Sequence, residues 1–149
     1  MNNNITIIYV IYRSGEIFFD NIRRLNNFKK IVVDNDPNSI LEDRIKKIDS
    51  TIDYTRLNKN IGMAKAANFA FNKVKTEFFL YLTADTIIDE NNINNLYKIF
   101  FKYESVGLSC PIHLSSENSY SGNYSCHPKY RSLNRNINEK KVFKSLSKI

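Results

Sequence analysis

The stretch Ile5-Thr6-Ile7-Ile8-Tyr9-Val10-Ile11 decides the fold class, because it is nearly continuous in apolar and β-branched residues. Such a run suits a strand that is buried on both faces of a sheet. The next four residues, Tyr12-Arg13-Ser14-Gly15, break the run. Ser14 is then expected to cap a helix that carries the apolar side chains Ile17, Phe18, Ile22 and Leu25. A strand followed at once by a helix is the first unit of an α/β sheet.

Three further strand-like stretches follow at similar intervals, and a weaker one closes the pattern. The strands are expected at Lys30 to Val33, Ile52 to Leu57 and Phe78 to Leu82, with the weaker one at Val106 to Cys110. Phe78 to Leu82 is apolar throughout, so we expect this strand to be central in the sheet. The alternation predicts an α/β fold with a mostly parallel sheet flanked by helices.

Helical spacing of apolar residues fills the intervals between these strands. Ser39-Ile40-Leu41-Glu42 has the form of a capping box before a helix that continues with Leu41, Ile45 and Ile48. A helix after Asn58-Lys59-Asn60-Ile61-Gly62 is expected to bury Ala67, Phe71 and Val74. Asp89 and Glu90 open another, with apolar residues at i, i+3, i+4 and i+7, namely Ile93, Leu96, Tyr97 and Phe100.

Length and composition fit one globular domain, because the chain has 149 residues and is 42% hydrophobic. A transmembrane helix is not expected, since no run of about 18 or more apolar residues occurs. The start of the chain has no basic segment typical of a signal peptide, so the cytoplasm is the expected compartment. Cys110 and Cys126 have no metal-ligand spacing; two free thiols are favoured there, and a disulfide stays the alternative.

The formal net charge of +7 is concentrated near the end of the sequence. Residues 127–149 carry Lys129, Arg131, Arg135, Lys140, Lys141, Lys144 and Lys148 against one acid, Glu139. We read residues 113–149 as an irregular basic tail, with a loop to residue 138 and a short helix over Val142 to Ile149. A solvated tail is the first interpretation. Contact with anionic lipid at the inner face of the membrane is the second, and nucleic acid is not expected.

Polar residues follow the expected strands at the edge where open α/β sheets bind their ligands. The groups are Tyr12-Arg13, Asp34-Asn35-Asp36, Asn58 to Asn68, and Thr83-Ala84-Asp85. Local turn chemistry explains each group alone as well as binding does, so the argument rests on their convergence at one edge. A dinucleotide site is disfavoured, because the first turn offers only Gly15 and no Walker A loop is present.

Three blocks of the sequence resemble successive motifs of family 2 glycosyltransferases, and of their rhamnosyltransferase-like branch in particular. The blocks are Ile31-Val32-Val33-Asp34-Asn35, Asn60-Ile61-Gly62-Met63-Ala64-Lys65-Ala66-Ala67-Asn68, and Phe79-Leu80-Tyr81-Leu82-Thr83-Ala84-Asp85-Thr86. The family forms read hydrophobic-Val-Asp-Asn, Asn-x-Gly-x-x-x-Ala-x-Asn and Leu-Asn-Pro-Asp-Thr, in the same order and at the same spacing. The resemblance covers roughly residues 4 to 112 and implies a GT-A domain over residues 1–112.

The resemblance implies a nucleotide-diphosphate-sugar donor and assigns roles to single residues. Tyr12 would lie against the base, with Arg13 beside it. Asp34 would accept a hydrogen bond from the base or the ribose, which suits the N–H of a uracil or thymine ring; a turn cap is the alternative. Asn60, Gly62 and Lys65 would shape the loop beside the ribose and diphosphate, where a helix start offers N–H groups. Lys65 as a solvated helix lysine is the alternative there.

By the same resemblance, Asp85 matches the last aspartate of the metal-binding Asp-x-Asp motif. A hard ion such as Mg²⁺ or Mn²⁺ would take carboxylate and phosphate oxygens. It would neutralise charge on the leaving nucleoside diphosphate. The alternative is that Asp85 or Thr86 only shapes the turn into the next helix. Thr83 stands where an aspartate or asparagine is usual in the family, which leaves a metal-poor site open.

The acceptor half of the family pattern is not recognised in this sequence. Transfer to a glycan or lipid-linked acceptor needs a base for the acceptor hydroxyl, and the acids after Pro111, Glu117 and Glu139, match no acceptor motif. A truncated glycosyltransferase that only binds donor is one interpretation, and a compact variant that works with a partner chain is another. A catalytically inert α/β module that binds a nucleotide or a partner is the competing hypothesis.

Overall fold

The computed structural model describes residues 4–111 and residue 114. It divides the chain into two compact units, Met1–Ser105 and Val106–Ile149. The first unit carries every helix and strand named below. The basic tail, the loop to residue 138 and the short helix predicted at Val142 to Ile149 lie outside the described residues, as does Cys126.

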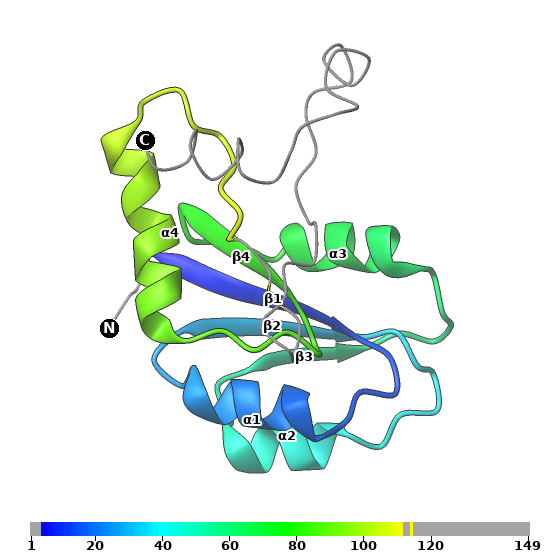
Figure 1. The fold of residues 1–149 in the computed structure, drawn as a ribbon. Helices are drawn as coiled ribbons and strands as arrows, with labels where there is room; N and C mark the ends of the chain where they lie inside the picture. Colours follow the sequence, from blue (N-terminus) through cyan, green and yellow to red (C-terminus); the bar gives the residue numbers. More distant parts are fainter. Residues whose placement is uncertain (1–3, 112–113, 115–149) are drawn as a thin grey trace. The chain divides into compact units, whose positions relative to one another are not determined.

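The first unit is built on a parallel sheet, which among the described residues has four strands in the order β3-β2-β1-β4 (Figure 1). The strands are β1 (Ile5–Ile11), β2 (Lys29–Asp34), β3 (Asp53–Arg56) and β4 (Phe78–Thr83). In the register, Ile8 of β1 lies opposite Ile31 of β2 on one side and Tyr81 of β4 on the other. The first strand of the chain is therefore interior to the sheet, as its apolar sequence predicts.

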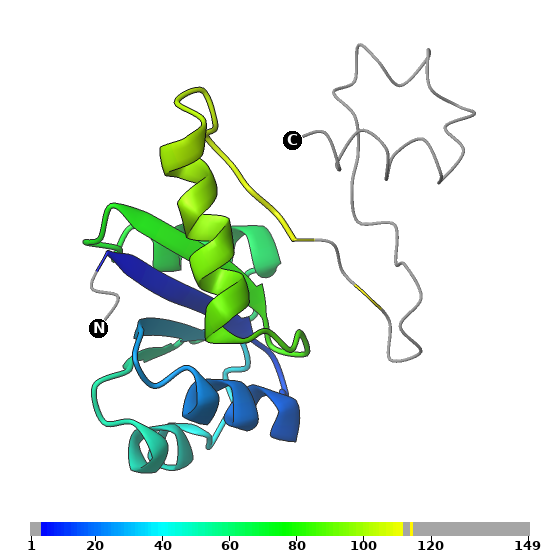
Figure 2. The same ribbon diagram turned by 60° about the vertical axis from the view of Figure 1, so that its left-hand side comes forward.

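Four helices connect and follow the strands in the described part of the chain: α1 (Glu16–Arg24), α2 (Glu42–Ile48), α3 (Met63–Phe71) and α4 (Glu90–Lys102). Figures 1 and 2 show α3 on one side of the sheet, away from α1 and α2. Side chains of α1, α2 and α4 share one apolar cluster with Ile7, Tyr9 and Ile11 of β1. Ala66 and Ala70 of α3 pack on the opposite face, against Ile8, Ile31 and Val33.

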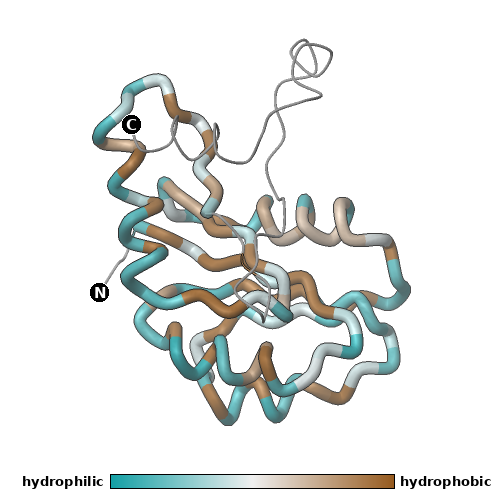
Figure 3. The backbone as a smooth tube through the Cα atoms, in the orientation of Figure 1, coloured by the Kyte–Doolittle hydropathy of each residue, from teal (hydrophilic) through white to brown (hydrophobic). Residues whose placement is uncertain are grey.

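The hydropathy pattern explains these layers. In Figure 3 β1 and β4 are hydrophobic along most of their length, whereas α1, α2 and α4 alternate between hydrophilic and hydrophobic positions. An amphipathic helix buries one stripe and leaves the other in water, so each of these helices can cover one face of a sheet. In α1, Phe18, Phe19 and Ile22 are buried and Ile17 is about half exposed. The predicted apolar face of this helix is thus correct except at Ile17, whose place is taken by Phe19.

The α/β fold and the mostly parallel sheet are confirmed, but the predicted central position of the Phe78–Leu82 strand is wrong. In the described residues β4 pairs with β1 alone and lies at an edge. Phe79 is 48% exposed and Tyr81 is 37% exposed. The weaker strand predicted at Val106 to Cys110 is also absent from this described segment. An apolar run therefore indicates a strand without fixing its place in the sheet.

Two predicted helix caps are wrong, and one is confirmed. Gly15, not Ser14, occupies the cap position of α1, and α2 begins at Glu42 rather than after Ser39. The Ser39 hydroxyl instead accepts a hydrogen bond from the Leu41 N–H in a local turn. Asp89 does cap α4, accepting a 2.7 Å hydrogen bond from the Asn92 N–H. A capping box is a local pattern, and it gives way where the chain forms a tighter turn first.

The buried face of α3 is displaced by one residue from the prediction. Ala66 and Ala70 are fully buried, whereas the predicted Ala67 is partly buried and Phe71 is 51% exposed. Val74 does pack against this cluster. Alanines one turn apart leave little bulk between helix and sheet, so α3 lies close against β1 and β2.

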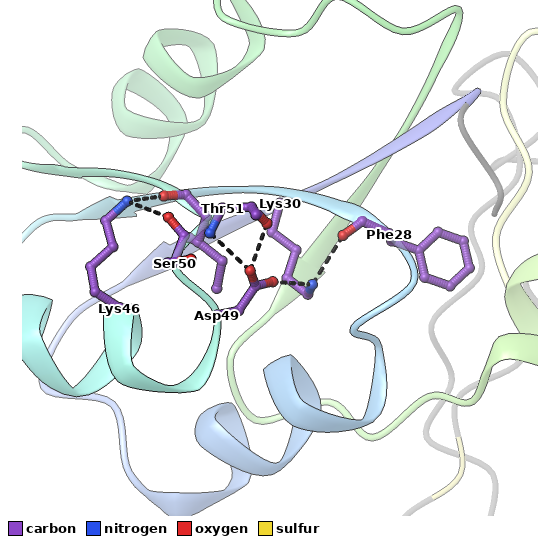
Figure 4. Close-up of polar contacts among 7 residues, drawn as sticks. Phe28, Lys30, Lys46, Asp49, Ser50 and Thr51 are labelled. Atoms are coloured by element: carbon purple, nitrogen blue, oxygen red, sulfur yellow. Dashed lines mark hydrogen bonds and ion pairs between the residues drawn. The ribbon is translucent and has the colours of Figure 1, made fainter.

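A network of charged and polar groups holds the amino-terminal end of β2 (Figure 4). The Lys30 side chain is fully buried, and its Nζ donates to the Phe28 carbonyl at 3.0 Å and to Asp49 Oδ2 at 2.9 Å. The other oxygen of Asp49 accepts from the backbone N–H and the hydroxyl of Thr51. Nearby, Lys46 donates to the carbonyl groups of Ser50 and Ile52. Burial alone raises the pKa of Asp49, but the hydrogen bonds from Thr51 and Lys30 leave it below the usual value.

None of the helices in the described part of the chain is both long enough and apolar enough to cross a lipid bilayer.

Candidate functional site

A pocket of about 730 Å³ opens at the carboxyl ends of β1 and β4 and beside the first turns of α1 and α3. This is the edge at which open α/β sheets bind ligands. Of the residues predicted to bind donor or metal, five line this one pocket. They are Tyr12, Asn60, Gly62, Thr83 and Asp85. Arg13, Asp34 and Lys65 are not among its lining residues.

Tyr12 and Arg13 leave β1 in a sharp turn. Arg13 has a left-handed backbone conformation, with φ at 52°. Its Nε donates to Asp36 Oδ2 at 3.2 Å, and its guanidinium lies 5.1 Å from the centre of the Tyr12 ring. The Tyr12 ring is 47% exposed, so one face of it remains available to a flat partner. Arg13 thus contacts Tyr12 from outside the pocket.

Asp34 ends β2 and is fully buried. Its Oδ2 accepts from the Tyr54 hydroxyl at 2.9 Å and its Oδ1 accepts from the Asp36 N–H at 3.0 Å. Burial, together with the Asp34 carboxylate, raises the pKa of Tyr54 to about 12. Both carboxylate oxygens therefore hold the β2–α2 turn and the neighbouring strand β3. This geometry favours the turn alternative for Asp34 over contact with a base.

Asn35 connects the end of β2 to the loop before α3, and sequence reasoning assigned it no role. Its amide Nδ2 donates to Asn60 Oδ1 and its Oδ1 accepts from the Ile61 N–H, each at 2.9 Å. Asn60 Oδ1 also accepts from the Gly62 N–H. Asn35 is 4% exposed. The two amide side chains thus fix the loop that forms one wall of the pocket.

Gly62 and Lys65 occupy the start of α3. Gly62 precedes the helix with φ 81° and ψ 158°, a region that residues with a Cβ rarely adopt, and no side chain caps the helix there. Lys65 lies in the first turn, which contains no acidic residue. A cation at the positive end of a helix dipole is unfavourable unless an anion is nearby. The start of α3 therefore presents positive potential beside the pocket.

Asp85 lies at the tip of the turn between β4 and α4. The turn is closed by a 3.1 Å hydrogen bond from the Thr86 N–H to the Thr83 carbonyl and by a 2.5 Å contact between the two threonine hydroxyls. Asp85 is exposed, and within the described part of the chain no hydrogen bond or ion pair reaches its carboxylate. Its charge at the pocket is therefore not paired by any side chain among residues 4–111.

A divalent metal fits this site only if most of its ligands come from elsewhere. No group of three or more His, Cys, Asp or Glu side chains gathers around a common point in the described residues. Mg²⁺ is commonly held by one or two carboxylates together with substrate phosphates and water. Asp85 supplies one such carboxylate. The other pocket acid, Glu16, pairs with Arg44 at 2.5 Å, and this hydrogen bond lowers the pKa of Glu16.

Other residues line the pocket for which no individual binding role was predicted. Ser14, Gly15, Glu16 and Ile17 come from the start of α1, Asn35 from the end of β2 and Met63 from the start of α3. Only their position in the sequence indicates that they line the pocket, because each follows a strand or begins a helix at the ligand-binding edge. Small polar residues in such turns have no side-chain pattern that separates lining from capping, so position was the only available guide.

The parallel sheet, the placement of α3 and the pocket at the carboxyl edge define an α/β domain of the GT-A type. A family model described as glycosyl transferase family 2 matches residues 16–147. The chain therefore belongs to glycosyl transferase family 2. The match includes most of the described domain and supports the family predicted from the three sequence blocks.

Among curated proteins, a teichoic acid poly(glycerol phosphate) polymerase of Staphylococcus epidermidis is 29% identical over 120 residues, which are 74% of this chain. The chain spans only 16% of the length of that relative. Two crystal structures of S. aureus TarS are similar in fold. TarS 1-349 matches with a TM-score of 0.58 at 16% identity, over 72% of this chain and 38% of that one. The second matches with a TM-score of 0.53 at 17% identity, over 66% and 20%.

Proposed function

We propose that this domain binds a nucleotide-diphosphate sugar in the pocket at the carboxyl edge, for transfer of the sugar to a glycan or lipid-linked acceptor. The observation that carries the proposal is the convergence of Tyr12, Asn60, Gly62, Thr83 and Asp85 on one pocket. These residues come from three segments far apart in the sequence. The motif blocks favour the rhamnosyltransferase-like branch of the family, and hence a deoxyhexose donor.

The nucleoside would bind near Tyr12, whose exposed ring offers a stacking surface. Asp34 would act indirectly, by fixing the turn after β2 through its bonds to Tyr54 and Asp36. Arg13 would hold the Tyr12 ring from its outer side. The base would thus be recognised by the side chain of Tyr12, a residue that lies in a tight turn.

The diphosphate would lie at the start of α3. The uncapped N–H groups of the first turn and the Lys65 charge both favour an anion there. Asn60 and Gly62 would set the position of the loop, because the Asn60 amide bonds to Asn35 and to the Gly62 N–H. Lys65 does not line the pocket itself, so its contribution would be electrostatic.

Asp85 would be the protein ligand of Mg²⁺ or Mn²⁺, with Thr83 beside it. A bound metal would stabilise the negative charge that develops on the leaving nucleoside diphosphate. Asp85 suits this function because its carboxylate is exposed and lies at the pocket. Thr83 contributes less, since its hydroxyl already contacts that of Thr86.

Thermal unfolding with nucleoside diphosphates tests the proposal. UDP or dTDP with Mg²⁺ or Mn²⁺, at about a hundred times its dissociation constant, should stabilise the chain by about 2.7 kcal/mol. Asp85→Ala should lose the part of this gain that depends on metal. Asp43→Ala, which removes an exposed aspartate of α2 that does not line the pocket, should keep all of it.

Absence of stabilisation by any nucleotide, with or without metal, would refute donor binding. Stabilisation without sugar transfer by the purified chain would instead favour the competing hypothesis of an inert nucleotide-binding module. The two outcomes separate the binding step from the chemistry.

A further inference from the structure

Asn21 lies in the middle of α1 and contacts a segment far away in the sequence. Its side chain is fully buried, and its Nδ2 donates to the Thr86 carbonyl at 2.7 Å. Thr86 closes the turn that carries Asp85. The bond therefore links the first helix of the domain to the turn after β4.

The turn is closed by hydrogen bonds among its own atoms. The Thr86 N–H bonds to the Thr83 carbonyl, and the Thr83 and Thr86 hydroxyls contact each other. These contacts set the shape of the turn but do not fix it against the rest of the domain. β4 places one end of the turn, and Ala84 and Ile88 pack against the main apolar cluster. Asn21 adds a directed hydrogen bond from α1 at Thr86.

Stability does not explain an asparagine at this position. The Asn21 Oδ1 atom is buried and has no hydrogen-bond partner in the described residues. A buried acceptor without a partner is destabilising, and an apolar side chain would avoid it. Asn21 is explained by its side-chain N–H group, which donates a hydrogen bond to the Thr86 carbonyl and so fixes the turn.

We propose that Asn21 is a positioning residue for Asp85, acting through the Thr86 carbonyl to hold the metal-binding carboxylate at the pocket. This inference rests on the proposed function, because the proposed function assigns a metal ion to Asp85. Residues that orient a metal ligand from behind commonly control affinity for the metal without touching it. Asn21 belongs to none of the three motif blocks, although it bonds to Thr86 at the end of the third.

The test uses the full chain with Asn21→Leu, which keeps the number of side-chain heavy atoms and removes the amide. Asn21→Ala removes the amide without adding bulk, so the test does not depend on leucine being accommodated. Ile22→Val is the matched control, because Ile22 is the next residue of α1 and is fully buried but makes no bond to the turn.

The first measurement is amide hydrogen exchange by NMR without ligand. Both Asn21 variants should speed exchange of the Thr86 N–H by roughly five- to tenfold, the effect expected of one lost hydrogen bond. The Asn35 N–H, which bonds to the Ile11 carbonyl at the same edge, should be unchanged. Ile22→Val should alter neither site selectively.

The second measurement is the affinity for Mn²⁺ in the presence of UDP. The Asn21 variants should bind the ion about tenfold more weakly. Their affinity for UDP without metal should stay as in the wild type. Unchanged Thr86 exchange in a folded Asn21 variant, or an equal loss of Mn²⁺ affinity in Ile22→Val, would overturn the inference.

The two measurements also separate this inference from the proposed function. If the wild-type chain binds neither UDP nor Mn²⁺, the proposed function fails, and so does the part of the inference that concerns metal. Exchange at Thr86 would still decide whether Asn21 anchors the turn.

Discussion

At the amino ends of the strands, the buried Lys30 ammonium is bonded to Asp49 and to the Phe28 carbonyl. At the carboxyl ends, Tyr12 and Asp85 are exposed beside a pocket, and in the described residues no hydrogen bond or ion pair engages Asp85. Both ends contain charged groups close to the same sheet. At one end these groups satisfy each other, whereas at the other they face the space where a ligand would bind.

The carboxyl end is nevertheless not loosely built. Asn35 bonds to Asn60 and to the Ile61 N–H, and Asn21 bonds to Thr86. The buried amides hold the loops, and the exposed side chains are carried on them. Binding at the proposed site would thus depend on polar groups whose hydrogen bonds hold the loops in place. Mutations at the two ends should therefore have separable effects on stability and on binding.

The largest effect is expected from Asp49→Ala at the amino end. It leaves the fully buried Lys30 ammonium without its counter-charge and should lower the free energy of unfolding by about 3 kcal/mol. Urea denaturation measures this. Asp53→Ala, which breaks the more exposed pair with Lys73, should cost less than about 1 kcal/mol. Equal losses of unfolding free energy in the two variants would contradict the importance of burial for this ion pair. A change in the nucleotide affinity of folded Asp49→Ala would contradict the separation of stability from binding.

At the carboxyl end, Gly62→Ala should destabilise the domain by about 2 kcal/mol, because the positive φ at this position strains any residue with a Cβ. Gly15→Ala is the matched control, since a Cβ added at either glycine would meet no atom within 4 Å and only Gly62 of the two has a positive φ. Chemical denaturation compares them. If Gly15→Ala were as costly, strain at Gly62 would not be the cause.

Asn35→Ala should lower both stability and nucleotide affinity. It removes two hydrogen bonds to the Asn60–Gly62 loop, which should cost about 1 to 2 kcal/mol. Calorimetric titration with UDP, together with urea denaturation, measures the two effects. Asn38→Ala changes an exposed amide of the same turn and should leave both as they are. Normal UDP affinity in Asn35→Ala would show that the loop is held by other contacts.

The smallest effect concerns pH and Tyr54. The pKa of Tyr54 is raised from 10.0 to about 12, by burial and then by the Asp34 carboxylate. The folded protein therefore holds this proton more tightly than the unfolded chain, so its stability falls as pH rises from about 10 to about 12.

Spectrophotometric titration of the wild type against Tyr54→Phe isolates this group. The difference spectrum should show a single tyrosine that ionises near pH 12. Ionisation near pH 10, the ordinary value, would show that Asp34 and Tyr54 are not held together in the folded protein.

Much of the fold could be read from the sequence where the pattern is local. Ile5–Ile11 forms β1 with the predicted bounds, and Asp89 caps α4 as predicted. The order of strands could not be read in this way. A run such as Phe78–Leu82 is equally apolar in an interior and an edge strand, because its neighbours are chosen by tertiary packing.

Site residues could be predicted where the side chain itself has chemistry suited to a ligand. They could not be predicted where a side chain only holds other parts of the site in position. Asp85 and Tyr12 stand out in sequence and line the pocket. Asn21 does not stand out, and Asn35 is marked only as part of a motif block, because a buried asparagine that holds a loop has no local signature. Their function appears only when the segments that they connect are brought together.

The interior position of β1 has a consequence for synthesis of the chain. β1 is synthesised before β4, yet its Ile5 pairs with Phe78 of β4. At about 5–20 residues per second, translation reaches that partner roughly 4 to 15 seconds later. The apolar edge of β1 must stay unpaired on that side throughout the delay. Slow codons between β1 and β4 would lengthen this exposure, and a chaperone that binds extended apolar segments would meet β1 first.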